Sequence, residues 1–407
     1  MKRWGLVGLL LMVAVGRAPA VVEMSAALDR QDAALTIYNP QITLVEERRV
    51  VSLAKGSNRI NFTWAGAGID PSSIYMESLK PQRVWEVSDI VFPNAGNLLT
   101  WEVASKESWS GEVRILYFLS GFSWRSEYIC FADTDEKTLA LKSSANIGNQ
   151  SGETFRDSEV RLVVGSPHLL SGGRGIMGAQ NAVAADAILA KGDGDGSFSR
   201  EGFSEYSIFN LKGRATLELN QNKQIPLLEA DKVGITKTYT WDPRSFGNQV
   251  AMHYEFKNTQ DNGLGAGLPE GRVRVFRRTE GGGMALVGED MLPFVPRGET
   301  AKLFLGSANN VVVERTLVDS RRENVVEAPD RSRVISFDQI LDIKIVIRNR
   351  KAGEVELRLF DPSAPGEVVQ SSHEYKREDA NTLKFVVKVP SDKEITITYR
   401  LKQKVIQ

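Results

Sequence analysis

The segment NGLGAGLPEGRVRVFRR, residues 262–278, has the glycine content of a loop that cradles a phosphate group. A dinucleotide-binding loop lies between a strand and a helix, because the helix N-terminus supplies the amide donors that hold the pyrophosphate. Here a turn at Pro269 and Gly271 follows the glycines. The alternating RVRVFRR after it is typical of a strand, as is QVAMHYEFKN before it. We therefore interpret the glycines as a hairpin connection, in which positive φ angles cost glycine little, and not as a nucleotide site.

The segment GDGDGSFSR offers carboxylate and hydroxyl oxygens at Asp193, Asp195 and Ser197, the type of ligand that calcium prefers. An EF-hand loop that starts at Asp193 needs glycine at its sixth position and glutamate at its twelfth. Those positions hold Phe198 and Ser204. A flexible polar loop is therefore the favoured interpretation, and a calcium site remains the alternative.

The three histidines, His168, His253 and His373, are far apart in the sequence, and none belongs to an H-E-x-x-H zinc motif. The serine-hydrolase motif G-x-S-x-G and the P-loop motif are also absent from the sequence. The single cysteine, Cys130, has apolar neighbours, so we predict a buried strand residue without a disulfide. We predict no cofactor and no metal, and we identify no catalytic residue.

Two functions toward carbohydrates follow from the residue types: hydrolysis by a pair of carboxylates, and sugar binding by tryptophans. A glycosidase needs only two carboxylates, on strands whose spacing a sequence does not report. Trp101, Trp109 and Trp124 lie near one another along the chain, and tryptophan faces stack on sugar rings. These three are the candidate ligand-binding residues. The alternative, which we favour, is that they fill a hydrophobic core.

The elements that would position these residues are strands, because apolar residues alternate with polar ones throughout the chain. The clearest examples are 112–119, 354–359, 382–389 and 394–401. Turn sequences separate the strands, and AKGSN at 54–58 predicts a hairpin. The fold class we predict is all-β, with tandem antiparallel β-sandwich domains and one short helical, glycine-rich insertion.

The domain organisation follows from changes in composition along the chain. In order, we predict a signal peptide at 1–20, an N-terminal β domain at 21–105, a central β domain at 106–310 with an insertion at 171–202, and a C-terminal Ig-like β-sandwich at 330–407. Within the insertion, Asn181–Lys191 is rich in alanine and lacks glycine and proline, so we expect a short helix there.

The first twenty residues have the layout of a secretory signal peptide. Lys2 and Arg3 precede an apolar run at 4–15, and Ala18–Ala20 fits a cleavage site. The run is shorter than the roughly 20 residues that a membrane-spanning helix needs, which argues against the alternative of an N-terminal anchor. We expect an exported protein, periplasmic or extracellular, with no membrane span after cleavage.

The composition is that of a folded globular chain and excludes one class of partner. Of 407 residues, 42% are hydrophobic and 25% are charged, and 51 basic residues balance 51 acidic ones. Such balance provides no field that would hold nucleic acid, so we predict no nucleic-acid partner.

Several segments resemble, in the family's order, a family catalogued as domain of unknown function 4139. They are LTIYNPQITLVEERRVVSLAKGSNRINF, EVRILYFLSGFSWRSEYIC, NIGNQSGETFRDSEVRLVVG, FKNTQDNGLGAGLPEGRVRVFRR, LVGED, PRGE and IRNRK. The resemblance spans about residues 34–403. Related proteins are called mucoidy inhibitors, a label that implies an effect on cell-surface polysaccharide. They carry an additional N-terminal domain with a long helical hairpin, which we do not find in this sequence. The family implies no catalytic residues.

These observations favour a non-enzymatic protein of the cell envelope that binds an envelope protein or a glycan, or that has a structural role. The alternative is a hydrolase that acts on envelope polysaccharide with two unidentified carboxylates.

Overall fold

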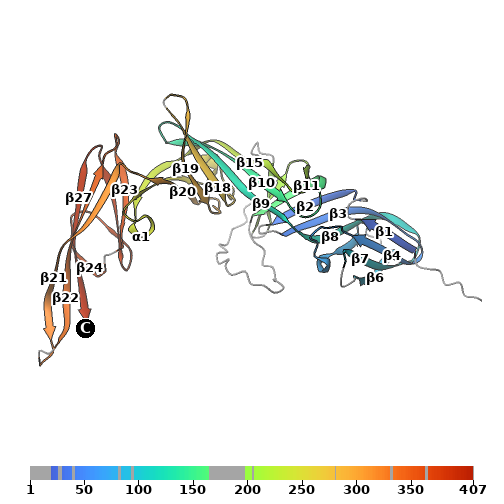
Figure 1. Ribbon diagram of the computed structural model, residues 1–407, viewed down its shortest axis with the longest axis horizontal. Helices are drawn as coiled ribbons and strands as arrows, with labels where there is room; N and C mark the ends of the chain where they lie inside the picture. Colours follow the sequence, from blue (N-terminus) through green and yellow to red (C-terminus); the bar gives the residue numbers. More distant parts are fainter. Residues whose placement is uncertain are drawn as a thin grey trace, which may run out of the picture. The chain divides into compact units, whose positions relative to one another are not determined.

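The structure is a computed structural model, and the residues that it describes form strands joined by turns and a few short helical turns (Figure 1). The described residues are 20–25, 30–38, 42–80, 84–92, 96–164, 198–203, 206–279, 281–330, 333–362 and 365–406. Outside them lie residues 1–19 of the predicted signal peptide, the predicted helix at 181–191, most of the predicted insertion and the possible calcium ligands.

Residue contacts divide the chain into two compact units. Unit 1 comprises 1–124, 147–191 and 198–223, and unit 2 comprises 125–146, 192–197 and 224–407. The predicted domain boundaries at residues 105 and 330 stay predictions.

Unit 1 contains thirteen of the described elements. They are β1 (Ala20–Ser25), β2 (Asp32–Tyr38), β3 (Ile42–Leu53), β4 (Gly56–Thr63), η1 (Pro71–Ser73), β5 (Tyr75–Ser78), β6 (Trp85–Val91), β7 (Leu98–Ser105), β8 (Trp109–Ser120), β11 (Phe155–Val164), β12 (Phe198–Phe203), β13 (Tyr206–Leu211) and β14 (Ala215–Leu217).

Two sheets of unit 1 share an aromatic core. One has the order β1-β4-β7-β6, and the other has the order β12-β13-β11-β2-β3-β8-β5, with β14 paired to β11. The ring of Phe62 from the first sheet lies 5.9 Å from those of Trp101 in the same sheet and Tyr117 in the second. All three side chains are at most 1% exposed. Burial of large rings is the main favourable contribution to such a core.

The predicted hairpin at 54–58 is wrong, although its two strands exist. The strand before it, β3, pairs with β2 and β8, whereas the strand after it, β4, pairs with β1 and β7. The turn therefore carries the chain from one sheet to the other. An alternating pattern identifies a strand and its buried face, but it does not identify the partner strand.

Unit 2 contains the remaining elements. Three of its strands, β9, β10 and β15, have a few residues at one end in unit 1 and the larger part in unit 2. The elements of unit 2 are β9 (Phe122–Ala132), β10 (Thr138–Asn149), β15 (Gln221–Gly234), β16 (Thr236–Trp241), α1 (Pro243–Phe246), β17 (Val250–Lys257), η2 (Gln260–Asn262), β18 (Gly271–Arg278), β19 (Met284–Leu292), β20 (Thr300–Ser307), β21 (Val311–Glu327), β22 (Val334–Asn349), β23 (Val355–Asp361), β24 (Glu367–Ser371), β25 (Lys376–Asp379), β26 (Thr382–Val389) and β27 (Glu394–Ile406).

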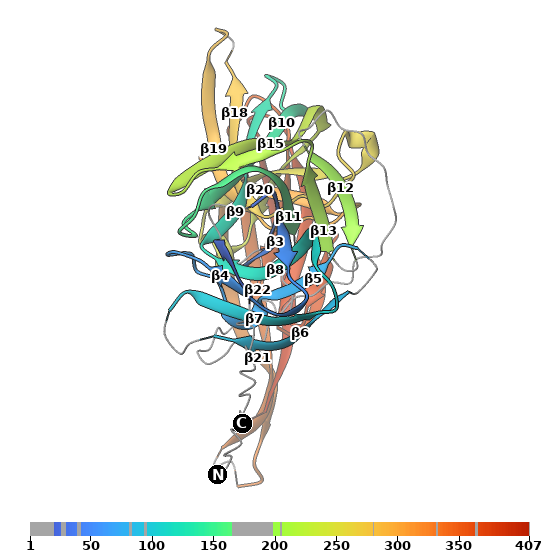
Figure 2. The same cartoon turned by 90° about the vertical axis from the view of Figure 1, so that its right-hand side faces the viewer.

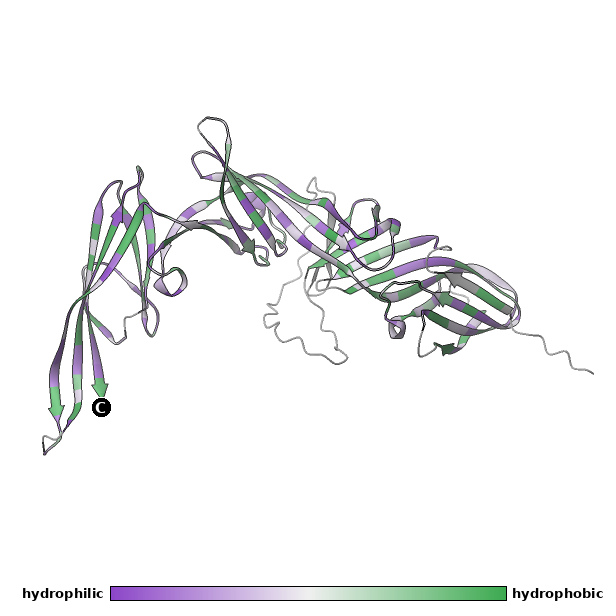
Figure 3. Cartoon of the chain, viewed as in Figure 1, coloured by the Kyte–Doolittle hydropathy of each residue, from purple (hydrophilic) through white to green (hydrophobic). Residues whose placement is uncertain are grey.

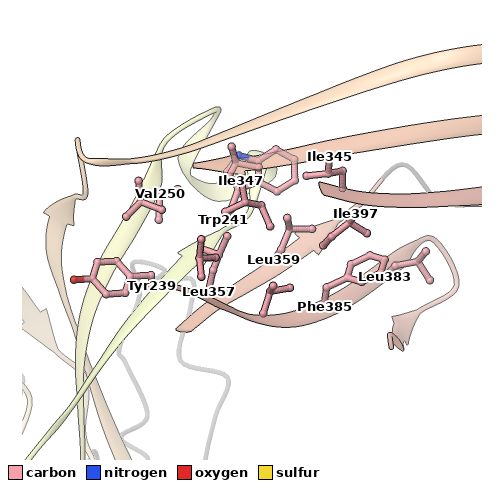
Figure 4. Close-up of a cluster of buried hydrophobic side chains, with 14 of the residues drawn as sticks. Tyr239, Trp241, Val250, Ile345, Ile347, Leu357, Leu359, Leu383, Phe385 and Ile397 are labelled. Atoms are coloured by element: carbon pink, nitrogen blue, oxygen red, sulfur yellow. The ribbon is translucent and has the colours of Figure 1, made fainter. Parts of the chain in front are cut away.

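The strands of unit 2 form three sheets and two hydrophobic cores. The sheet orders are β15-β10-β9-β18-β19, β20-β17-β16-β23-β26-β25 and β21-β22-β27-β24. Side chains of β16, β23 and β26 pack on those of β21, β22 and β27, among them Trp241, Leu359, Phe385 and Ile345 (Figure 4). The second core joins β17 and β20 to the sheet that contains β9 and β18. The six-stranded sheet thus contributes to both cores.

The all-β class is confirmed, but the sheets are mixed rather than purely antiparallel. Parallel pairs join β1 to β4, β2 to β11, β9 to β18 and β16 to β23. These partners are far apart in the sequence or lie across a change of sheet. Alternating hydrophobicity marks the strands (Figure 3) and is the same for either strand direction, so it does not predict the parallel pairs.

Candidate functional site

The glycine-rich part of the segment, residues 262–270, is a turn, as predicted, and the side chain of Asn258 binds its backbone. The side-chain amide of Asn258, which is fully buried, donates hydrogen bonds to the carbonyl oxygens of Ala266, Val295 and Pro296 at 2.7, 3.0 and 3.0 Å. Its oxygen accepts a hydrogen bond from the amide of Gly265, whose φ is +94°. A strand, β18, begins at Gly271, so no helix N-terminus is available for a phosphate.

The hairpin topology predicted for this segment is wrong. The strand before it, β17, pairs with β16 and β20, whereas β18 pairs with β9 and β19. Glycine is required at Gly271 for a packing reason, because a Cβ atom there would lie 2.0 Å from the carbonyl oxygen of Ser126 on β9. The segment therefore changes sheets, and a glycine lets the next strand approach its parallel partner closely.

The three candidate tryptophans do not form one exposed cluster. Trp101 is 1% exposed and Trp124 is 4% exposed, so both lie in cores. Trp109 is partly exposed, and its ring packs edge-on against that of Trp85 with the centroids 5.7 Å apart. Burial of Trp101 and Trp124 is the arrangement expected of core residues and leaves no open ring face for a sugar. Ligand binding at Trp109 stays a prediction.

The cysteine and one of the histidines are buried. Cys130 is fully buried on β9, as predicted, and burial raises the pKa of its thiol to about 12, which keeps it protonated. His253, on β17, is 3% exposed and packs against the rings of Phe246 and Phe304. Burial lowers the pKa of His253 to about 4. Within the described ranges, no three His, Cys, Asp or Glu side chains are grouped so that they could hold a metal ion.

A buried ion cluster in unit 1 brings two carboxylates, those of Glu47 and Glu153, to the same arginine. Glu47 and Arg49, both on β3, are fully buried, and the guanidinium of Arg49 donates to Oε2 of Glu47 at 2.6 and 2.8 Å. The other oxygen, Oε1, accepts a hydrogen bond from the hydroxyl of Tyr117 at 2.6 Å and pairs with Arg30 at 2.7 Å. Arg30 also binds Glu153 at 2.5 Å.

The geometry of this cluster indicates a structural role. Both oxygens of Glu47 are occupied by cationic or hydroxyl donors, and the side chain is closed to solvent. Burial raises the pKa of Glu153, and it raises that of Tyr117 well above the ordinary value. A general acid must reach a substrate oxygen, and a nucleophile needs a free carboxylate oxygen on the opposite side. Glu47 meets neither requirement.

Sequence reasoning missed this cluster, although a signal was present. Glu47 and Arg49 occupy the same strand face as Val45, Val51 and Leu53, which are buried. Charged residues in phase with the apolar positions of a strand must pair inside the core, because an isolated buried charge is too costly. The partners Tyr117 on β8 and Arg30 just before β2 could not be read from the sequence.

In unit 2, two further carboxylates are each bound by a cationic side chain and a tyrosine hydroxyl. Asp361 is fully buried and accepts hydrogen bonds from Arg315 at 2.6 Å and from the hydroxyl of Tyr399. Glu136 binds Lys237 at 2.6 Å and the hydroxyl of Tyr254 at 2.5 Å. In each case a carboxylate is held by a cation and a tyrosine, so these groups also fasten strands together.

A pocket of about 330 Å³ opens in unit 1. It is lined by Ile147, Asn149, Thr216, Leu217, Glu218, Gln221, Asn222 and Lys223. Several of its polar groups already bind the protein, because Asn149 donates to the carbonyl of Leu217, Glu218 accepts from Thr154, and Lys223 donates to the carbonyl of Thr216. The pocket lacks an aromatic wall and an unshared catalytic pair.

The exposed side of the sheet formed by β9, β18 and β19 presents a row of apolar side chains. Phe131 on β9 lies opposite Phe276 on β18, and their rings stack with centroids 5.9 Å apart. Phe276 lies opposite Leu286 on β19, which is 59% exposed. Met284, two residues along the same strand, is 46% exposed. We call these four residues the Phe131 row.

Charged pairs border the Phe131 row on the same side of the sheet. Arg274 donates to Glu289 at 2.8 Å and lies 3.7 Å from Glu127. Arg125 pairs with Glu127 at 3.2 Å. An apolar centre with a polar, charge-balanced border is the usual composition of a protein–protein interface.

The strand that carries the outer end of the row is an edge strand. Among the described strands, β19 ends the sheet order, and it lies beside β18 in both views of the molecule (Figure 2). A bulge between Val275 and Phe276 shifts its register, and Gly288 packs so closely on Leu305 that a Cβ atom would lie 2.8 Å from the Leu305 Cα. The half of β19 that contains Met284 and Leu286 lies beyond this bulge.

No helix in the described part of the chain has the length and apolar character needed to cross a membrane. Comparison with curated proteins finds no match. The family model described as "Domain of unknown function (DUF4139)" matches residues 113–404, which include the glycine-rich turn and the Phe131 row. This confirms the resemblance read from the sequence. Because the match covers more than half of the chain, the chain belongs to the DUF4139 family.

Proposed function

We propose that this member of the family is an exported, non-enzymatic protein that binds an envelope protein through the Phe131 row. The observation that carries the proposal is the exposure of Leu286 and Met284 beside the stacked rings of Phe131 and Phe276. Methionine and aromatic side chains are enriched at protein interfaces because they bury large areas and adapt to a partner's shape.

Export is supported by the leader-like sequence at 1–20, with its basic start, apolar run and small residues before a cleavage point. A single buried cysteine is compatible with an oxidising compartment, because its thiol is not exposed to oxidants.

The partners of the buried carboxylates support a binding function better than hydrolysis. The acids Glu47 and Asp361 are each held by an arginine and a tyrosine and are fully buried, so neither carboxylate is open to a substrate. Glu153 has a raised pKa, as a general acid would, but its carboxylate is bound to Arg30. We therefore assign the functional surface to the Phe131 row.

The experiment is capture of envelope proteins by the mature chain, with cross-linking, followed by the same capture with Leu286→Glu. We expect the variant to lose the captured protein, because a charge in the apolar centre of an interface must be desolvated without a partner. Val386→Glu is the matched control, because Val386 is 55% exposed on β26 and lies outside the row. Thermal unfolding of both variants checks that they fold.

Equal capture by the wild type and by Leu286→Glu would remove the Phe131 row from the binding site. Turnover of an envelope polysaccharide by the wild type, with loss of turnover in Glu153→Gln, would instead support the hydrolase alternative. A glycan array with the mature chain separates glycan binding from protein binding.

A further inference from the structure

The strand β21 presents a long unpaired edge in unit 2. It has 17 residues and ends the order β21-β22-β27-β24 of its sheet among the described strands. At the end of the sheet that β24 does not reach, the described strands are β21, β22 and the last residues of β27 (Figure 1). Leu317, Val318 and Val326 on this edge are 50, 61 and 51% exposed. A long edge with exposed apolar side chains is a template for another strand.

The charges along this edge alternate in sign on one face. Asp319, Arg321 and Glu323 pair in register with Asp342, Ile340 and Asp338 of β22, so their side chains share one side of the sheet. Arg321 binds Asp319 and Glu323 at 2.9 Å each. Acid, base and acid therefore follow one another at every second residue. A second copy of the strand that runs in the opposite direction can place an acid opposite a base.

The charges on both faces of the strand together select one antiparallel register between two copies. With a two-fold axis at Ser320, perpendicular to the sheet, Asp319 of each copy lies opposite Arg321 of the other. An axis at Arg321 would place arginine opposite arginine and Asp319 opposite Glu323, and an axis at Asp319 would place the two aspartates opposite each other. An axis at Arg322 would place Arg321 opposite Glu323, but on the other face it would place the two Arg322 side chains opposite each other. Like charges directly opposite destabilise a strand pair, and opposite charges stabilise it.

We propose that two copies of this chain associate by antiparallel pairing of their β21 edges about Ser320. The pairing joins two four-stranded sheets into one continuous sheet. Backbone hydrogen bonds along the edge hold the two copies together, and the two Asp319–Arg321 pairs specify the register. The surface involved is separate from the Phe131 row, so this inference does not depend on the proposed binding function.

The first test uses charge reversal and mixing, with the mass of the full chain measured by sedimentation. We expect the wild type to have twice the monomer mass. Asp319→Arg and Arg321→Asp should each have the monomer mass, because each variant places like charges opposite each other. An equimolar mixture of the two variants should regain the doubled mass, because every substituted residue then faces an opposite charge. Circular dichroism confirms that each variant folds.

The second test places a thiol on the proposed axis. Ser320→Cys should form a disulfide-linked dimer on oxidation, because residues directly opposite in a strand pair have the Cα separation that a disulfide requires. Thr316→Cys, an exposed position on the same strand away from the axis, should not form one. The native Cys130 is buried and contributes no background.

A wild type that stays monomeric, a mixture of the charge variants that fails to dimerise, or equal cross-linking at positions 320 and 316 would each overturn the proposal.

Discussion

The buried ion cluster of unit 1 and the ion network on β21, β22 and β27 use the same chemical groups in opposite surroundings. In the first, Arg49 binds Glu47 at 2.6 Å and both side chains are completely buried. In the second, Arg400 binds Asp342 at 2.6 Å, and Arg321 binds the same carboxylate at 2.9 Å, with side chains 24–38% exposed. The interatomic distances alone do not distinguish the two.

The difference lies in what happens when one partner is removed. Water solvates the remaining charge at an exposed site, so the loss is small. Inside a core no water replaces the missing partner, and the remaining charge or polar group bears the full cost of desolvation. The comparison predicts that burial, and not the number of ion pairs, decides which polar residues this fold needs.

The largest loss of stability is expected for Glu47→Gln. The change leaves Arg49 and Arg30 without the carboxylate between them, and loss of one partner of a buried pair costs about 3–5 kcal/mol. Urea unfolding followed by tryptophan fluorescence measures the free energy of unfolding. The matched control is Glu46→Gln, the adjacent residue, whose side chain is 23% exposed and pairs with Arg161. It should lose at most about 1 kcal/mol. Similar losses for both variants would contradict the comparison.

A pH-dependent effect is expected from His253. Burial is the main reason that its pKa is lowered from 6.5 to about 4. At a pH between these two values, this histidine binds a proton in the unfolded chain but not in the folded chain. Stability should therefore fall as the pH falls from about 6.5 to 4, by up to about 3 kcal/mol.

Unfolding measured across this pH range for His253→Phe tests the effect, because the phenyl ring keeps the packing against Phe246 and Phe304 without a titrating group. The variant should lose this part of the pH dependence. His373→Phe, which changes a histidine outside the core, should keep it. The same pH profile in both variants would place the titration elsewhere.

A smaller loss is expected for Asn258→Ala in the glycine-rich turn. The change leaves the carbonyl oxygens of Ala266, Val295 and Pro296 without their donor, and unsatisfied buried groups cost about 1–3 kcal/mol. Thermal unfolding measures the loss. Asn262→Ala is the control, because that side chain makes hydrogen bonds at an exposed position of the same turn. An equal loss would show that turn geometry, and not burial, sets the cost.

The smallest effect is expected for Asp342→Asn. Although it removes two ion pairs, with Arg400 and Arg321, both are partly exposed, so the loss should be at most about 1 kcal/mol. High salt should reduce the difference between variant and wild type further, because it screens exposed charges. A loss as large as that of Glu47→Gln, unchanged by salt, would show that this network behaves as a buried one.

Strand positions and the conformational role of the glycine cluster could be predicted from the sequence. The segment 382–389 coincides with β26, and 394–401 begins β27. Their partners could not be predicted, because a turn such as AKGSN can join strands of different sheets as well as neighbours in one sheet. The Phe131 row was not predicted either. Its members come from three strands, and only the register of β9, β18 and β19 places them side by side.

The sequence by itself determined that this is an all-β chain of the DUF4139 family, because a period-two pattern and the order of family motifs are properties of consecutive residues. The tertiary structure decided which charges are buried together, which apolar side chains remain exposed and which described strand lies at the edge of its sheet. These depend on pairing between segments far apart in the chain, such as Glu47 with Tyr117 and Phe131 with Phe276. Such pairing arises when two sheets close over a core, and the alternation along any one strand is compatible with many partners.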